Sequence, residues 1–239
     1  GLRIVENNEQ GSNPNAIPEI LIRGANSIMT ENQADVNTPL IMLDGVEISI
    51  QELYDLGIRS FGENYVQELC DKIDKLSDDI NWHMIGHLQR NKVKYIVGKV
   101  AMIHSVDSIR LAEAISKEAV KKDVTVDILI EVNVGMEENK FGITVESAYE
   151  DIKEMAKLPN IAIKGLMTSA PFVENSEDNR KYFRQLKQLS VDIQSKNIDN
   201  VDMGILSMGM TNDYIVAIEE GATIVRVGTA IFGARNYNI

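Results

Sequence analysis

The sequence predicts an α/β fold, and within that class a single (β/α)8 TIM barrel with an irregular N-terminal segment. From Ser60 onward, short apolar runs alternate with amphipathic stretches of helical period, as in proteins built around a parallel sheet. Seven such runs can be counted, one fewer than an eight-stranded barrel needs. The length of 239 residues, of which 44% are hydrophobic and 25% charged, suits one domain of this size.

The seven runs are short, apolar or β-branched, and bounded by polar or turn-forming residues, which is typical of buried strands. They are Ser60–Gly62, Trp82–Gly86, Met102–Ser105, Asp127–Asn133, Ala162–Met167, Ile205–Met208 and Ile224–Gly228.

Helical stretches lie between the predicted strands. In Asp107–Ala119 the apolar residues recur at spacings near three and four, with charged residues between them. The same pattern occurs in Val145–Lys157 and Asn179–Lys196, and a shorter version, Asp213–Glu220, ends at Gly221.

The missing first strand must come from the N-terminal quarter of the chain. Pro39–Gly45 is the candidate, because Leu40–Leu43 is apolar and an Asp-Gly turn signal follows it; Ser49–Leu56 reads as the helix after that strand. Eight βα units then result. We therefore expect residues 1–38 to form an irregular extension and residues 39–239 to form the barrel.

The charge of the chain is acidic and unevenly distributed. The 24 basic and 36 acidic residues give a net charge of -12, and Gly1–Asp55 contains nine acidic residues but only two basic ones. The first lysine is Lys72. Such a chain repels phosphate backbones and anionic lipids, so neither nucleic acid nor a membrane is an expected partner. No apolar run approaches the roughly 18 residues of a membrane helix.

In a barrel of this kind, ligands bind at the carboxyl ends of the strands. The last two loops look suited to an anion, since Ser207–Thr211 supplies hydroxyl groups and Gly209 before a helix, and Gly228 and Thr229 supply similar chemistry from the next strand. The sequence thus favours a phosphate here. In the alternative interpretation the glycines only permit turns, and Ser207 only caps a helix.

Other reactive side chains have simpler explanations. The three histidines, His83, His87 and His104, lack the spacing of a metal site, and each alone is best explained as a structural residue, although His83 should point toward the mouth. Cys70, the only cysteine, fits a helix pattern and a reducing compartment. Met208 and Met210 read as core residues, with the alternative that one covers a flat ligand.

From about Tyr54 to its C-terminus the chain resembles the pyridoxal 5'-phosphate homeostasis proteins (YggS/PROSC type), relatives of the N-terminal barrel of alanine racemase. The motifs that carry the resemblance are Phe61-Gly-Glu-Asn-Tyr-Val-Gln-Glu68, Trp82-His-Met-Ile-Gly-His-Leu-Gln89 with Asn91-Lys92, His104-Ser-Val-Asp107, Gly165-Leu-Met167, Leu206-Ser-Met-Gly-Met-Thr-Asn-Asp213 and Val225-Arg-Val-Gly-Thr-Ala-Ile-Phe-Gly233.

The resemblance implies a cytoplasmic barrel that binds pyridoxal phosphate and buffers or supplies it without catalysing a reaction. It implies that Ser207, Gly228 and Thr229 hold the phosphate, that Arg226 faces the pyridine nitrogen, and that Asn64 and His83 lie near the ring. The full set of expected cofactor-binding residues is Asn64, His83, Ser207, Met208, Gly209, Arg226, Gly228 and Thr229.

The chain departs from the family at the first strand. There the family has Val-Ser-Lys-Thr, whose lysine forms the Schiff base with the cofactor. Counting back from Gly57 by the family's spacing reaches Leu43 or Asp44, and no lysine precedes Lys72. We therefore expect weak, noncovalent binding, with phosphate or sulfate able to occupy the same site. A racemase would also need a tyrosine base from a second domain, which we expect to be absent.

The N-terminal quarter resembles the plug domain of SusC-type TonB-dependent receptors. The matching strings are Arg3-Ile-Val-Glu-Asn-Asn8, Pro18-Glu-Ile-Leu-Ile-Arg-Gly-Ala-Asn26 and Thr38-Pro-Leu-Ile-Met-Leu-Asp-Gly-Val-Glu47. This suggests a chimera joined near Gln51–Leu56. The alternative to a cofactor carrier is then a non-binding scaffold in which the substituted strand disrupts the site.

Overall fold

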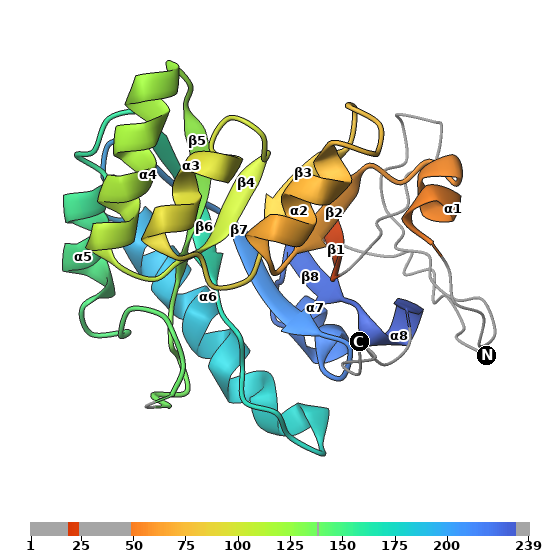
Figure 1. Ribbon diagram of the computed structural model, residues 1–239. Helices are drawn as coiled ribbons and strands as arrows, with labels where there is room; N and C mark the ends of the chain where they lie inside the picture. Colours follow the sequence, from red (N-terminus) through yellow and green to blue (C-terminus); the bar gives the residue numbers. More distant parts are fainter. Residues whose placement is uncertain (1–18, 24–48, 138, 233–239) are drawn as a thin grey trace, which may run out of the picture.

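The computed structural model describes residues 19–23, 49–137 and 139–232, and within them eight parallel strands follow one another in chain order around a closed barrel (Figure 1). Each strand pairs with its neighbours in sequence, and the last pairs with the first. The strands are β1 (Glu19–Arg23), β2 (Ser60–Glu63), β3 (Asn81–Met84), β4 (Met102–Val106), β5 (Val126–Glu131), β6 (Ile161–Met167), β7 (Val201–Met210) and β8 (Ile224–Val227).

Helices connect the strands and cover the outside of the barrel (Figure 1). The longest are α4 (Ile109–Lys122) and α6 (Arg180–Gln194). The others are α1 (Ile50–Asp55), α2 (Val66–Ile73), α3 (Val93–Ile96), α5 (Ala148–Met155), α7 (Tyr214–Glu219) and α8 (Thr229–Phe232), with two short 3-10 helices, η1 (Arg90–Lys92) and η2 (Ser176–Asn179).

The first strand is not the segment that the sequence suggested. β1 is Glu19–Arg23, which pairs with β2 through Ile22 and Phe61 and with β8 through Glu19 and Ile224. The prediction that Pro39–Gly45 fills this place is therefore wrong, and β1 lies inside the expected irregular extension; Pro39–Gly45 itself falls outside the described residues.

This error has a physical reason. Both Ile20–Ile22 and Leu40–Leu43 are short apolar runs preceded by proline and followed by glycine within one or two residues, so composition cannot distinguish them. Counting back from Gly57 also assumed that the connection between the first and second strands has the length usual in the family. The strand-end position expected for Leu43 or Asp44 belongs instead to Arg23, whose backbone pairs with Gly62.

The other predicted elements are confirmed, with ends that differ by a few residues. The largest difference is in β7, which begins at Val201 instead of Ile205. Ser49 caps α1, since its hydroxyl accepts a hydrogen bond from the backbone N–H of Glu52, and the Glu52 carboxylate accepts one from the Ser49 N–H in return. This reciprocal pair explains why a helix begins at that point of the chain.

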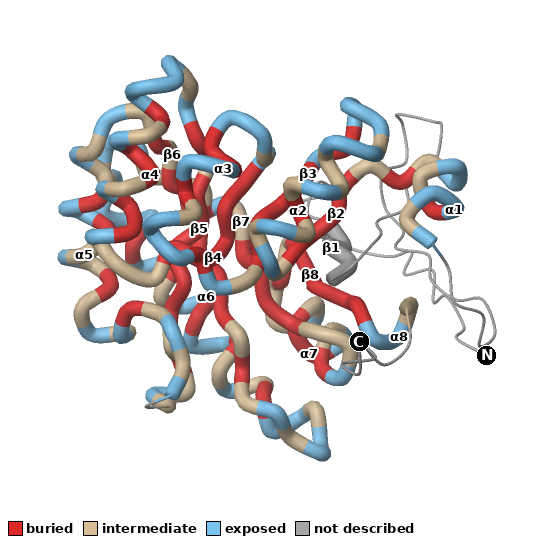
Figure 2. The backbone as a smooth tube through the Cα atoms, viewed as in Figure 1, coloured by how far each residue is buried: buried red, intermediate tan, exposed pale blue. Residues whose placement is uncertain are grey.

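The core lies inside the barrel and between the strands and their helices (Figure 2). On α4 the buried positions Leu111, Ala112, Ile115 and Ala119 form one stripe, as the helical period predicted. Several polar side chains are also buried near the strand ends, among them His104, Ser207 and Arg226. No helix in the part of the chain described above is long and apolar enough to cross a membrane.

Candidate functional site

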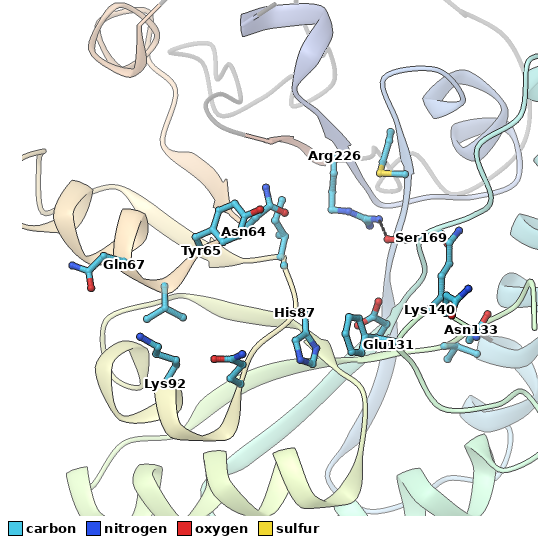
Figure 3. A pocket seen from close by; sticks show the side chains of 18 residues that line it. Asn64, Tyr65, Gln67, His87, Lys92, Glu131, Asn133, Lys140, Ser169 and Arg226 are labelled. Carbon is cyan, nitrogen blue, oxygen red and sulfur yellow. Dashed lines mark hydrogen bonds between the residues drawn. The ribbon is translucent and has the colours of Figure 1, made fainter. Parts of the chain in front are cut away.

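A cavity of about 590 Å³ opens at the carboxyl ends of the strands (Figure 3). Arg226 comes from β8, Glu131 from the end of β5, and Asn64 from the residue after β2. The remaining lining residues are Tyr65, Val66, Gln67, Ile85, Gly86, His87, Gln89, Lys92, Val132, Asn133, Asn139, Lys140, Phe141, Ser169 and Met210. The cavity therefore lies where a barrel of this class binds its ligand.

Arg226 is held in one orientation at the floor of the cavity. The residue is only 3% exposed. Nη1 donates to the backbone oxygen of Ser207 at 2.9 Å and to its hydroxyl at 2.7 Å. Nη2 donates to the backbone oxygen of Thr168 at 2.8 Å and to the Ser169 hydroxyl at 3.3 Å (Figure 3). Because β7 and the two residues that follow β6 both contact the planar group, the barrel places a fixed positive charge beside the cavity.

Behind Arg226 a chain of hydrogen bonds runs into the barrel interior. The Ser207 hydroxyl lies 3.0 Å from Nδ1 of His104, and Nε2 of His104 lies 3.0 Å from Nδ1 of His83. Burial lowers the pKa of His104 well below its usual value, and the nearby His83 and Arg226 lower it further. His104 is therefore neutral near pH 7, and its ring can accept at one nitrogen and donate at the other.

The loops after β7 and β8 meet at Thr211. Its hydroxyl oxygen accepts hydrogen bonds from the N–H of Gly228 at 3.4 Å and from the hydroxyl of Thr229 at 3.0 Å. Asp213 stabilises the loop after β7. Its carboxylate accepts hydrogen bonds from the backbone N–H of Met210 and from the side-chain amide of Asn179, each at 2.7 Å. Hydroxyl and N–H donors thus gather at the loops that the sequence predicted for a phosphate.

Gly209 has a packing role that requires glycine. It adopts φ +90°, and a Cβ at this position would lie 2.5 Å from the Cβ of Ala217 on α7. The pairing of β7 with β8 shifts register between Ser207 and Met210, so Met210 comes opposite Arg226. Gly209 therefore lets α7 approach the strand while β7 bulges toward the cavity.

Glu131 and Lys140 also reach the cavity, although neither was among the predicted site residues. Glu131 is 9% exposed, and burial raises its pKa to about 7. The positive charges of Arg226 and Lys140 oppose that rise, whereas Asp107 adds to it. Lys140 forms an ion pair of 2.6 Å with Glu137 and donates to the backbone oxygen of Ser169 at 3.2 Å.

The structure separates the predicted site residues into two groups. Asn64 and Arg226 line the cavity, and Gly228 and Thr229 meet Thr211 at the neighbouring loops. The other four are buried behind this surface and do not line the cavity: His83, Ser207, Met208 and Gly209. Glu131 was not predicted as a site residue because the predicted strand Asp127–Asn133 ends two residues later than β5, which ends at Glu131.

Two further predictions concern Cys70 and metals. Cys70 is a free, partly buried residue that packs against the core from α2. Among the described residues no group of three or more His, Cys, Asp or Glu side chains is arranged to hold a metal ion.

Comparison with protein families identifies residues 45–236 as an alanine racemase N-terminal domain. A pyridoxal phosphate homeostasis protein of Aquifex aeolicus is 51% identical over 189 residues, which cover 79% of this chain and 82% of that protein. The pyridoxal phosphate homeostasis protein of Schizosaccharomyces pombe is 36% identical over 194 residues, covering 78% and 79% of the two chains.

Solved structures show the same fold. PipY of Synechococcus elongatus, solved without pyridoxal phosphate (PLP), has a TM-score of 0.76 at 30% identity and covers 90% of this chain and 93% of its own. The structure of PipY with PLP bound has a TM-score of 0.74 at 29% identity, covering 92% and 94%. Alanine racemase of Clostridium difficile, at 15% identity and a TM-score of 0.64, shares the fold over 79% of this chain and 48% of its own.

Proposed function

Because this chain belongs to the family of pyridoxal phosphate homeostasis proteins, we propose that it binds pyridoxal 5'-phosphate noncovalently and weakly, as a carrier or buffer. Its relatives are named for homeostasis and not for a reaction, in agreement with the expectation that the chain is not an enzyme. The PLP-bound structure of PipY supports this cofactor.

The observation that carries the proposal is the fixed guanidinium of Arg226 at the cavity floor. When bound, the cofactor supplies an aldehyde and an electron-accepting pyridine ring. A guanidinium does not give up its proton in a protein. Arg226 would therefore face the pyridine nitrogen and keep that nitrogen unprotonated, which suits storage of the cofactor better than catalysis.

The donors around Thr211 support a place for the phosphate. Gly228 and Thr229 present an N–H and a hydroxyl group there, and Thr211 adds its own hydroxyl. Ser207 is fully buried and bonded to Arg226 and His104, so we assign it to holding Arg226 and not to direct contact with the phosphate. Free phosphate or sulfate would bind at the same donors.

The distribution of lysines supports noncovalent binding. No lysine precedes Lys72, and β1 ends at Arg23. A family-type covalent bond at the first strand is therefore unavailable. The lysines that line the cavity are Lys92 and Lys140, which belong to the loops after β3 and β5.

Isothermal titration with pyridoxal phosphate, up to millimolar concentration, tests the proposal. We expect a measurable but weak affinity, which Arg226→Gln lowers by about tenfold or more, as loss of a charged hydrogen-bond donor predicts. Arg110→Gln, a change of the same type at an exposed position on α4, should leave the affinity unchanged. An absence of heat with both phosphate and pyridoxal phosphate would favour the non-binding scaffold.

Borohydride reduction tests the noncovalent mode separately. A stable imine would be reduced to a labelled lysine, which mass spectrometry of the digested protein locates. We expect no labelled peptide from the cavity, including those with Lys92 and Lys140. A stoichiometric label there would overturn this part of the proposal.

The N-terminal segment has its own proposal. The family match begins at residue 45, and the first lysine appears only at Lys72, which supports a chimera in which receptor-plug sequence, including β1, stands where the family has its own first strand. Sequencing the source gene across codons 45–60 tests it, because uninterrupted reads from a native locus would exclude an assembly artefact.

We keep the cytoplasm as the expected compartment, supported by the free thiol of Cys70.

A further inference from the structure

The buried carboxyl group of Glu131 lines the same cavity as Arg226, the cation that would hold the ligand. It is the last residue of β5, and its backbone oxygen accepts a hydrogen bond of 2.9 Å from the N–H of Ile143. In Figure 3 its side chain lies between those of His87 and Lys140, and below that of Arg226 in this view. A ligand that fills the cavity would therefore lie close to this carboxyl.

Charged groups from three other segments act on Glu131. Arg226 on β8 and Lys140 in the loop after β5 favour the ionised carboxylate, whereas Asp107 after β4 opposes it. Asp107 is itself paired with His87, whose Nδ1 lies 3.2 Å from its carboxylate. Burial has the largest effect and raises the pKa of Glu131 to about 7. Near neutral pH the empty site is therefore a mixture of the charged and the neutral form.

We propose that Glu131 couples binding of a phosphate-bearing anion in this cavity to the uptake of one proton. An incoming anion adds negative charge beside the carboxylate and removes water from it, and both changes favour the neutral acid. The proton comes from the solvent and is bound by a carboxylate oxygen of Glu131. A proton that the pyridine nitrogen of the ligand gives up beside Arg226 goes to the solvent, and this release is the same in a chain that lacks the Glu131 carboxylate. The proposal rests on the proposed function, since it takes pyridoxal phosphate as the ligand.

Coupling of this kind has a defined pH dependence. Below pH 6 the carboxyl is already protonated, so binding takes up no proton at this site. Above pH 7 the protein must first be protonated, and its affinity then falls as the pH rises. Between pH 6.5 and 8.5 we expect a loss of affinity of about five- to tenfold that depends on Glu131.

Calorimetry measures the proton directly. Pyridoxal phosphate is titrated into the full chain at pH 7.5 in two amine-free buffers that differ in ionisation enthalpy, and the difference in heat gives the number of protons bound. We expect Glu131 to contribute an uptake of about 0.5 to 0.8 proton per ligand to the wild-type total, because about three-quarters of a group with pKa 7 is ionised at that pH. The proton lost by the pyridine nitrogen enters the same total, so the contribution of Glu131 is the difference between the wild type and a variant that cannot titrate there.

Two variants assign the proton to a residue. Glu131→Gln keeps the shape of the side chain but cannot titrate, so its net proton uptake should be lower than that of the wild type by about 0.5 to 0.8 proton per ligand, and its affinity at pH 8.5 should exceed that of the wild type. Glu113→Gln, at an exposed position on α4, removes the same charge away from the cavity and should behave as the wild type.

Each outcome has a distinct meaning. Binding with the same net proton uptake in the wild type and in Glu131→Gln would overturn the inference and leave the proposed function intact. A wild-type chain that releases no heat with pyridoxal phosphate in any buffer would overturn both.

Discussion

The guanidinium of Arg226 donates a hydrogen bond of 2.7 Å to the hydroxyl of Ser207, and this contact joins the cavity to a buried pair of histidines. On its far side the same hydroxyl meets His104, which in turn meets His83. The orientation of the cavity's cation thus depends on groups that a ligand does not touch. This arrangement explains why polar residues occupy positions in β3, β4 and β7 that would otherwise be apolar core.

Replacing Ser207 by alanine should destabilise the protein and loosen Arg226. The change leaves a buried guanidinium N–H and a buried imidazole nitrogen without their partner, for which we expect a loss of about 2 to 3 kcal/mol in the free energy of unfolding. Urea denaturation measures it. Ser190→Ala is the matched control, because this buried hydroxyl makes one bond to the backbone oxygen of Met203, and its loss should cost only about 1 kcal/mol. Equal losses of stability in Ser207→Ala and Ser190→Ala would contradict the role of Ser207 in joining Arg226 to His104.

His104 should make the folded state sensitive to acid. Its pKa is lowered in the folded protein, so below pH 6.5 the unfolded chain binds a proton that the folded chain does not. Stability due to His104 is present above pH 6.5 and is lost as the pH falls, by up to about 1.4 kcal/mol per pH unit. His104→Gln should reduce this slope between pH 6.5 and 5, measured by denaturation at each pH. An unchanged slope would show that another group binds the proton.

In the absence of ligand, Glu131 should make the folded protein less stable as the pH rises, which is opposite to the effect of His104. Its pKa rises from 4.5 to about 7 on folding, so the folded chain retains a proton that the unfolded chain has lost. This contribution is present at low pH and disappears as the pH rises through 7. Relative to Glu131→Gln, the wild type should lose about 2 kcal/mol of stability between pH 5 and 8. A constant difference between the two proteins would contradict the assigned titration.

Gly209→Ala should destabilise the strand next to the phosphate loops. The new Cβ would have to accept φ +90° and would lie 2.5 Å from the Cβ of Ala217, so we expect a cost of about 2 to 4 kcal/mol. Gly204→Ala, in the same strand, is the control: its Cβ would approach only the exposed side chain of Asp202, and the stability should change by no more than about 0.5 kcal/mol. Thermal or urea unfolding compares the two variants.

Local sequence patterns determined most of the fold. Strands β2 to β8 could be located because each is a short apolar run between helices, and the period of Ile109–Lys122 identified the buried face of α4. The first strand could not be located in this way, because Ile20–Ile22 and Leu40–Leu43 are equivalent as apolar runs. Only pairing with β2 and β8 distinguishes the strand that closes the barrel.

The sequence by itself determined the type of barrel, the ends of the strands where a ligand would bind, and the absence of any lysine before Lys72. The tertiary structure decided which side chains face the cavity: it placed Arg226 and Glu131 there, and put Ser207 and His83 behind them. The physical reason is that chain order gives the strand on which a residue lies. Burial, register and charge at the strand end arise only when eight strands close around a common interior.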